Sequence, residues 1–382
     1  MKKSILNIEK LHNKKDFIKA LGFISESITS IKTKDNCLSI TIEDNCDKEG
    51  ILEKINDLYN RYLDIREDEI LETDSNKRSY FTKVSSAIKN LAPGMIELQG
   101  KSVFLFRYFE SVFERIATNL GAEIKIYPVL LPISSYIKTG YLKNSPQYAY
   151  FCYGVEENLE NLEKLNNKLI KNISINNNLQ KMQFALSPSA CFHTYLDYQE
   201  QILDSEKIIT FTQNVFRNEG RFNFSERGRF RDYHVREIVF MGSSNFVNAT
   251  RSKIIEKTIE FVKSIGFDYC LVTASDSFII PKLQKYKNIQ KLEKTKYELR
   301  LNIDPENDIS VASFNIHGTA FTEPFNISVK DVEKTVTGCV GYGIERWVYA
   351  FLSQFGDDEK NWPKKIYDVY KNNNGELLWT SK

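Results

Sequence analysis

The densest group of residues that could do chemistry lies between positions 217 and 237. Arg217 and Glu219 follow an apolar run. After a loop, five residues occupy alternating positions: Arg229, Arg231, Tyr233, Val235 and Glu237. If the two segments form an antiparallel hairpin, side chains two apart share a face, so cations, a ring and carboxylates would line one surface.

Such a face is costly to bury without a partner. A nucleotide triphosphate with its metal would offset that cost, because guanidinium groups pair with phosphate oxygens and a tyrosine ring can stack on a base. A solvated strand face with surface ion pairs is the alternative interpretation.

A second group of this kind lies near the C-terminus. Gly341 and Gly343 precede Arg346, and an apolar helix is predicted to continue through Leu352. Glycines permit close backbone approach, and a cation in the first turns of a helix, together with the helix dipole, favours an anion. Taken alone, the segment also fits a tightly packed turn.

The elements that position these groups divide the chain into two parts. Residues 1–75 are predicted to form a small α+β unit, with a strand at 38–42 and a helix at 48–63 capped by Asp47. We expect residues 76–97 to be a linker and residues 98–382 to be the catalytic domain. Further helices are predicted at 103–120, 158–171 and 250–265, and strands at 124–131 and 208–212. Strands without regular βαβ alternation indicate a mainly antiparallel sheet flanked by helices, an α+β fold.

The overall composition excludes little. The chain has 382 residues, 42% of them hydrophobic, enough for a large core and a smaller domain. Its 52 basic and 50 acidic residues demand neither nucleic acid nor a membrane surface as partner. No apolar run reaches the ~20 residues that span a bilayer, and no signal peptide is recognisable. We therefore expect a cytoplasmic protein whose six cysteines are reduced and free for metal binding.

Together, the two groups resemble motifs 2 and 3 of class II aminoacyl-tRNA synthetases. The helix and strand around Gly121 and Pro128 resemble motif 1, which in that family forms the dimer interface. The resemblance implies an antiparallel-sheet catalytic domain and a homodimer. It also implies that Arg217 holds the α-phosphate of ATP, that Tyr233 stacks on adenine and that Arg346 holds the γ-phosphate. Glu219 and Arg229 would complete the nucleotide site.

Within this class the chain is similar to the amino acid:carrier protein ligases, relatives of the methanogen-type seryl-tRNA synthetases. The similarity covers about residues 98–358 and rests on four segments: 140–147, 186–195, 236–242 and 339–356. It implies a zinc ion held by Cys191, Glu237 and Cys339. Three protein ligands leave one position of tetrahedral zinc open, and the family uses that position for the substrate's α-amine. Ordinary buried thiols are the alternative for both cysteines.

The same resemblance suggests further site residues. Glu298 would bind Mg²⁺ on ATP, and Ser313 and Asn315 would line the substrate pocket. Asp276 matches a family aspartate, but the residues after it, Ile279 to Lys282, depart from the family pattern and leave the substrate preference open.

The predicted function is therefore ATP-dependent formation of an aminoacyl-adenylate from a small amino acid such as glycine or alanine. The acyl group would then pass to the phosphopantetheine thiol of a carrier protein. The alternative is a zinc-dependent seryl-type aminoacyl-tRNA synthetase. Residues 1–75 hold 12 basic and 16 acidic residues, a net charge of −4 that disfavours tRNA. A catalytically degenerate regulatory subunit is a third, non-enzymatic alternative.

Overall fold

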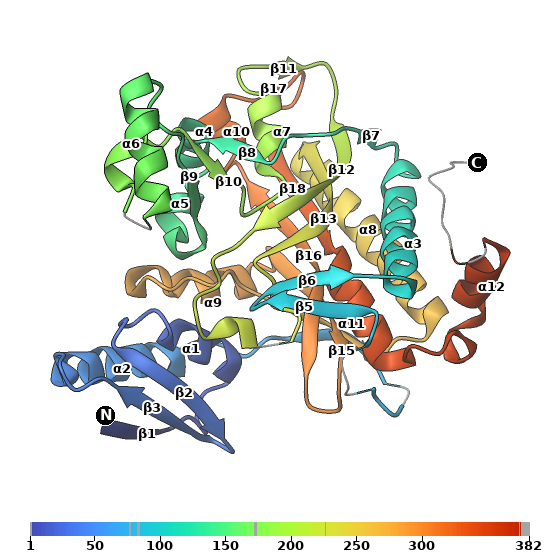
Figure 1. The fold of residues 1–382 in the computed structure, drawn as a ribbon. Coiled ribbons are helices and arrows are strands. Elements are labelled where there is room, and N and C mark those ends of the chain that lie inside the picture. The colour runs from blue at the N-terminus through green and yellow to red at the C-terminus, as the bar shows by residue number, and fades with distance from the viewer. Residues whose placement is uncertain are drawn as a thin grey trace.

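An eight-stranded sheet forms the centre of the molecule (Figure 1). The computed structural model describes residues 2–75, 78–81, 85–171, 174–225, 227–373 and 375. The strand order is β4 (Ile70–Asp74), β14 (Tyr269–Thr273), β15 (Lys296–Asn302), β16 (Asp308–Gly318), β18 (Val336–Gly343), β13 (Asp232–Gly242), β12 (Lys207–Phe216) and β7 (Glu123–Ile124). The strands from β4 to β12 pair antiparallel, and only the short edge strand β7 pairs parallel with its neighbour. The expected α+β fold with an antiparallel sheet is confirmed.

Three helices cover one face of this sheet: α3 (Lys101–Thr118), α8 (Ser244–Ile265) and α11 (Ile344–Phe355). Aromatic rings from the helices and the sheet make the core between them. Phe113 of α3 stacks on Tyr342 of β18 with ring centroids 4.0 Å apart, and the fully buried Trp347 of α11 packs beside them. The helix predicted at 250–265 begins earlier, because Ser243 caps it by accepting the Phe246 N–H, and it ends at Gly266 with a left-handed φ of 78°.

Between α3 and β12 the chain builds a separate subdomain. A three-stranded sheet forms from β8 (Leu130–Pro132), β10 (Phe184–Leu186) and β9 (Tyr150–Cys152). Around it lie α4 (Ile133–Lys138), α5 (Tyr141–Asn144), α6 (Leu159–Ile170) and α7 (Phe192–Asp197). The prediction of one continuous strand at 124–131 is wrong. Pro128 has no N–H to donate to a ladder, so the segment divides into β7 and β8.

The N-terminal unit has the order β1 (Lys2–Asn7), α1 (Lys14–Leu21), β2 (Ile28–Lys34), β3 (Cys37–Ile42) and α2 (Lys48–Leu63). The predicted helix at 48–63 is confirmed to the residue, and the Asp47 carboxylate accepts the Gly50 N–H at 3.0 Å. Its buried residues are spaced three or four apart and form one face of the helix: Ile51, Ile55, Leu58 and Tyr62.

The division between the two parts differs from the sequence prediction. β4 belongs by sequence to the segment 1–75, yet it pairs with β14 in the large sheet. In the segment expected to be a linker, β5 (Ile88–Ala92) and β6 (Met95–Leu98) form a hairpin. β4, β5 and β6 are only four or five residues long, too short to give a period from which their pairing could be predicted. The remaining regular elements are β11 (Ile202–Leu203), α9 (Lys285–Leu292), α10 (Thr322–Phe325), β17 (Ser328–Val329) and α12 (Lys364–Asn372).

Helix α9 joins the N-terminal unit to the large sheet. The Lys287 ammonium is fully buried, pairs with the Asp16 carboxylate of α1 and donates to the Tyr62 hydroxyl at 2.9 Å. Lys291 pairs with Asp68 at 2.7 Å and donates to the Arg66 carbonyl at 2.6 Å. Because the two lysines are buried and their carboxylate partners come from the N-terminal unit and the segment after it, these contacts seat that unit on α9 in one defined orientation.

We expect Asp16→Asn to lower the free energy of unfolding of the N-terminal unit by about 3 kcal/mol, because it leaves the Lys287 ammonium buried without a counter-charge. Burial raises the pKa of Asp16, but the Lys287 ammonium outweighs that effect and lowers the pKa from 3.8 to about 2. The stabilisation is therefore present above about pH 4 and is lost as the pH falls through 2.

The measurement is urea unfolding followed by circular dichroism at several pH values. Asp57→Asn, which removes an exposed pair with Arg61, is the matched control and should change little. Equal stability of Asp16→Asn and the wild type at neutral pH would contradict this account.

In the part of the chain that the structure describes, no helix has the length and apolar character needed to cross a membrane.

Candidate active site

A polar cavity of about 870 Å³ lies on the sheet face opposite α3, α8 and α11. Strand alternation accounts for its lining, since side chains two apart point to the same face. On β18, Cys339 and Gly341 line the cavity while Val340 and Tyr342 enter the core. On β13, Glu237 lines the cavity, whereas Arg236 points the other way and pairs with Glu110 of α3.

The strand register brings the predicted residues into two rows across the sheet. In one row Glu237 lies beside Gly341, which lies beside Ser313 and then Glu298. In the next row, Cys339 lies beside Asn315, followed by Lys296. Residues more than 100 positions apart in sequence therefore become immediate neighbours.

Cys191, Glu237 and Cys339 form a compact group of possible metal ligands. All three are buried, and their ligand atoms lie within 4.8 Å of one another. Cys191 comes from outside the sheet, as the residue that begins α7. Gly341 makes room for the Glu237 carboxylate, because a Cβ at this position would lie 2.8 Å from Glu237 Oε2.

Neighbouring side chains hold these sulfur atoms in place. Ser189 Oγ lies 3.3 Å from Cys191 Sγ, and Asn315 Nδ2 and His317 Nε2 lie 3.6 and 3.3 Å from Cys339 Sγ. Burial lowers the pKa of His317 to about 4, so its imidazole is neutral at neutral pH and can donate one N–H to sulfur.

The donor set fits a zinc ion. Burial raises the pKa of Glu237 to about 7, and the hydrogen bond with Cys191, followed by burial, raises the pKa of the Cys339 thiol. The Cys339 thiol and the Glu237 carboxyl thus resist ionisation unless a cation joins them, and a divalent metal reverses this preference. Two sulfur ligands and one oxygen are a donor set that zinc accepts, with one coordination position left open.

Arg217, Tyr233 and Arg346, the residues expected to bind the nucleotide, lie together at one end of the cavity. Arg217 Nε donates to the Pro188 carbonyl at 2.9 Å, which points the rest of the guanidinium into the cavity. Arg346 sits in the first turn of α11, as predicted, and lies over the Tyr233 ring at 4.6 Å from its centroid. Its Nη1 donates to the Ser310 carbonyl at 3.2 Å, while the buried Nε and Nη2 have no hydrogen-bond partner among the residues that the structure describes. Buried donors without partners suit an incoming anion.

Glu219 and Arg229 lie together at the same end, with Oε2 and Nη1 3.6 Å apart. Glu219 is only 2% exposed and its Oε1 has no partner within the described part of the chain, so it can accept a hydrogen bond from a ligand. The prediction that Arg231 shares this face is wrong. β13 begins only at Asp232, and Arg231 instead stacks on Phe224 at 3.9 Å and donates to the Pro93 carbonyl.

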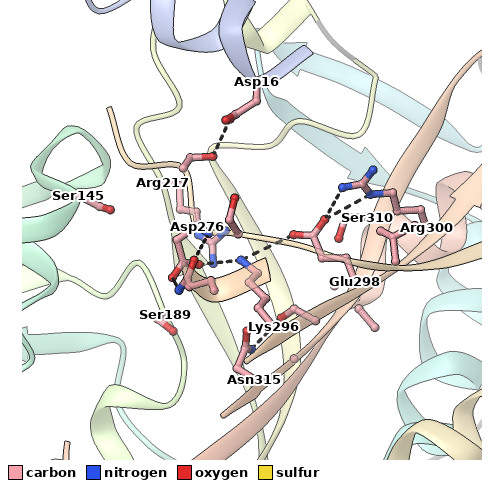
Figure 2. Close-up of a pocket in the computed structure, with 18 of the residues that line it drawn as sticks. Asp16, Ser145, Ser189, Arg217, Asp276, Lys296, Glu298, Arg300, Ser310 and Asn315 are labelled. Carbon is pink, nitrogen blue, oxygen red and sulfur yellow. Dashed lines mark hydrogen bonds and ion pairs between the residues drawn. The ribbon is translucent and has the colours of Figure 1, made fainter. Parts of the chain in front are cut away.

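A line of alternating charges crosses the cavity floor (Figure 2). Lys296 Nζ lies 2.7 Å from Asp276 Oδ1 and 3.7 Å from Glu298 Oε1, and Arg300 lies 3.3 Å from Glu298 Oε2. Burial raises the pKa of Glu298, but Lys296 and Arg300 outweigh it and lower the pKa. A carboxylate paired with two cations binds Mg²⁺ only if one cation releases it, so the Mg²⁺ role of Glu298 stays a prediction.

The sequence prediction missed several residues of this cavity. Lys296 and Arg300 lie two residues either side of Glu298, so strand alternation could have placed them on its face. His317 lies two residues beyond Asn315 in the same way. The contributions of Asn13, Lys15 and Lys19 from the N-terminal unit had no sequence signal, because they depend on how two units dock.

Comparisons with known proteins agree with this architecture. Residues 173–355 match the tRNA synthetase class II core domain (G, H, P, S and T). The whole chain superposes on a Methanopyrus kandleri seryl-tRNA synthetase solved with an Aquifex aeolicus tRNA, with a TM-score of 0.71 and 18% identity, covering 79% of that chain. A seryl-tRNA ligase from Naegleria fowleri, solved with AMP, matches 88% of this chain and 73% of its own, with a TM-score of 0.62 and 11% identity. The chain therefore has a fold like that of the class II aminoacyl-tRNA synthetases, and the segment 173–355 matches their core domain.

The sequence relatives are type-2 serine–tRNA ligases. The Methanococcus aeolicus enzyme is 28% identical over 280 residues, and the Methanocaldococcus jannaschii enzyme 29% identical over 274. These alignments cover 69% and 68% of this chain but only 53% and 52% of the relatives. The chain thus spans about half the length of these curated relatives.

Proposed function

We propose that this protein activates a small amino acid with ATP, forming an aminoacyl-adenylate and pyrophosphate. The observation that carries the proposal is the placement of Cys191, Glu237 and Cys339 in the same cavity as Arg217 and Arg346. A zinc ion held by the two cysteines and Glu237 would therefore lie beside the two arginines that we propose bind the phosphates of ATP.

The residues of the cavity supply orientation and charge neutralisation. When bound, zinc supplies an open coordination position that selects the unprotonated α-amine of the substrate. The substrate carboxylate then attacks the α-phosphorus, and the bond to pyrophosphate breaks. Arg217 and Arg346 neutralise charge that develops on the phosphate oxygens, and no side-chain nucleophile is required. Orientation alone can lower such a barrier by about 7–11 kcal/mol.

The nucleotide base requires a rearrangement of Arg346. This guanidinium covers the face of Tyr233 on which we propose that adenine stacks. If Arg346 moves off the ring, the base can occupy its place, and the planar guanidinium can reach a phosphate or the other face of the base. Mg²⁺ would accompany ATP, with Glu298 as the proposed ligand once Arg300 releases it.

Both Ser313 and Asn315 line the cavity: Asn315 lies beside Cys339, and Ser313 lies in the neighbouring row beside Gly341, which fits their proposed role in lining the amino-acid pocket. Glycine and alanine differ by one methylene-sized group, worth only about 1–3 kcal/mol, and serine adds one hydroxyl. Because such small differences do not separate these candidates, we propose a small amino acid as the substrate class without choosing among them.

For the second step we propose transfer to the phosphopantetheine thiol of a carrier protein. The thiol sulfur attacks the acyl carbon and AMP leaves. The net charge of −4 on residues 1–75 supports this acceptor over tRNA. Transfer to tRNA is the second candidate, favoured by the function of these sequence relatives, which are serine–tRNA ligases.

A two-stage assay separates these acceptors. ATP–pyrophosphate exchange over the common amino acids identifies the substrate, and the labelled amino acid is then offered to a phosphopantetheinylated carrier protein and to bulk tRNA. Loading of the carrier supports the proposal. Loading of tRNA without carrier would replace it with the second candidate.

We also propose that the protein forms a homodimer through the segment that contains β7 and β8. Exposed apolar side chains cluster there: Ile124 (55% exposed), Ile126 (93%), Val129 (38%) and Leu130 (43%). Water-exposed aliphatic side chains gathered in one short segment are typical of a covered interface. The resemblance of this segment to motif 1 supports the same assignment.

We expect Ile126→Asp to convert the dimer to a monomer, because it places a charge in the centre of that apolar surface. Light scattering coupled to size exclusion measures the mass. Ile5→Asp, at a 76% exposed site of the N-terminal unit, is the control and should leave the dimer intact. A monomeric wild type, or a dimer that survives the Ile126 change, would argue against this interface.

A further inference from the structure

Asp276 is held in the cavity by a residue of helix α9. Gln290 accepts a hydrogen bond from the Asp276 N–H at 2.7 Å and donates one to Asp276 Oδ2 at 2.9 Å. Lys296 occupies the other carboxylate oxygen at 2.7 Å. Both the backbone and the side chain of Asp276 are therefore fixed, and Gln290 makes two of the three bonds.

This aspartate lies close to the proposed amino-acid pocket. Asp276, Asn315, His317 and Cys339 line one cavity, and Asp276 interacts electrostatically with the His317 imidazole, which in turn lies 3.3 Å from Cys339 Sγ. Figure 2 shows Asp276 between Arg217 and Lys296, facing the open part of the cavity. A small rotation of its carboxylate would thus change the hydrogen bonds offered to a bound amino acid.

The same helix carries the contacts that seat the N-terminal unit. Lys287 pairs with Asp16, Lys291 donates to the Arg66 carbonyl, and Asn288 exchanges hydrogen bonds with the Asp64 carbonyl (2.8 Å) and the Arg66 N–H (2.9 Å). Gln290 lies on the same helix, between Asn288 and Lys291 in sequence. Ser277, next to Asp276 in sequence, also donates to Asp16 at 3.3 Å. The N-terminal unit therefore contacts both the helix and the loop that hold Asp276.

We propose that Gln290 is a positioning residue that directs the Asp276 carboxylate toward the bound amino acid, and that docking of the N-terminal unit on α9 holds Gln290 in place. This inference rests on the proposed amino-acid activation. It gives the N-terminal unit a role in the amino-acid pocket. Ile279, in the segment that departs from the family pattern, also packs against the core of that unit.

Steady-state ATP–pyrophosphate exchange by the full-length protein tests the proposed role of Gln290. Gln290→Met keeps the length of the side chain and removes both hydrogen bonds. We expect the KM for the amino acid to rise about tenfold, as for the loss of a positioned hydrogen bond, with the KM for ATP changed less than about twofold. Gln290→Glu retains the acceptor for the Asp276 N–H but sets a second carboxylate against Oδ2, and should be at least as impaired. Lys285→Ala, on the exposed side of α9, is the matched control.

Combined variants test whether docking of the N-terminal unit on α9 holds Gln290 in place. Asn288→Ala removes only contacts between α9 and the N-terminal unit and should raise the KM for the amino acid about threefold. In the double variant with Gln290→Met, its effect should nearly vanish, because both changes act through the same carboxylate. Asp16→Asn provides an independent disruption of the docking, with folding checked by circular dichroism.

Three results would overturn the inference. The first is a Gln290→Met variant no more affected than Lys285→Ala. The second is an equal rise of the two KM values, which would indicate general damage. The third is a double variant whose rise in KM for the amino acid equals the product of the rises in the Asn288→Ala and Gln290→Met single variants. Each would leave the proposed function standing, whereas a zinc-loaded wild type without exchange for any amino acid would remove both.

Discussion

Cys339→Ala is expected to abolish stoichiometric zinc binding and to lower ATP–pyrophosphate exchange by at least ~10³-fold. The remaining ligands, Cys191 and Glu237, are too few to hold zinc tightly, since zinc sites in proteins need three or four protein ligands. Without the metal, the amine of the substrate has no electrophile to bind. Metal analysis and exchange kinetics on the same preparation measure both effects.

The controls separate metal loss from misfolding. Cys339→Ser keeps the volume of the side chain but ligates zinc poorly, so it should behave like Cys339→Ala. Cys152→Ala, on β9 and outside the cluster, should retain one zinc per chain. A folded Cys339→Ala protein that keeps its zinc and its activity would refute the ligand assignment.

Arg346→Ala is expected to lower kcat/KM for ATP by about 10²–10³-fold, the usual cost of removing one positioned donor to a developing anion. This expectation rests on the position of the Arg346 guanidinium. Nε and Nη2 of this side chain are buried and have no partner in the part of the chain described by the structure, and α11 presents them at its N-terminal end. Glu345, one residue earlier, accepts the His234 N–H of β13 at 2.9 Å and fixes the start of the helix against the sheet.

The measurement is exchange at varied ATP with saturating amino acid. The loss should appear in ATP-dependent constants, while amino acid binding to the metal site, followed by calorimetry, should persist. Arg61→Ala on the exposed side of α2 serves as the arginine control. An Arg346→Ala protein with an unchanged ATP dependence would exclude this arginine from the nucleotide site.

Much of the site could be predicted because its residues sit in local patterns with fixed geometry. Alternation on β13 and β18 places Glu237 and Cys339 on one face, and the turn before α11 places Arg346 near them. The pairing of β16 with β18, which brings Asn315 beside Cys339, was not predicted; the family resemblance gave only the expectation that Asn315 lines the substrate pocket.

What the sequence did not reveal depends on tertiary docking. Gln290 lies on a short polar helix whose function appears only when the N-terminal unit covers it. The exclusion of Arg231 from the cavity follows from Phe224, which offers a ring in the preceding loop. The join between the two parts was misplaced because β4, with exposed and half-buried side chains, finds its partner β14 almost 200 residues later. Local pattern carries no information about such a pairing.

The central claim is that a zinc-held amino acid is activated by ATP in this cavity. The most direct test is ATP–pyrophosphate exchange by one preparation in three states: as purified with zinc, after removal of the metal by a chelator, and after zinc is returned. The account predicts exchange with one or a few small amino acids, its loss without metal and its recovery with zinc, and no exchange with the corresponding α-hydroxy acid. Undiminished exchange by the metal-free protein, or no exchange with any amino acid in the zinc-loaded state, would contradict it.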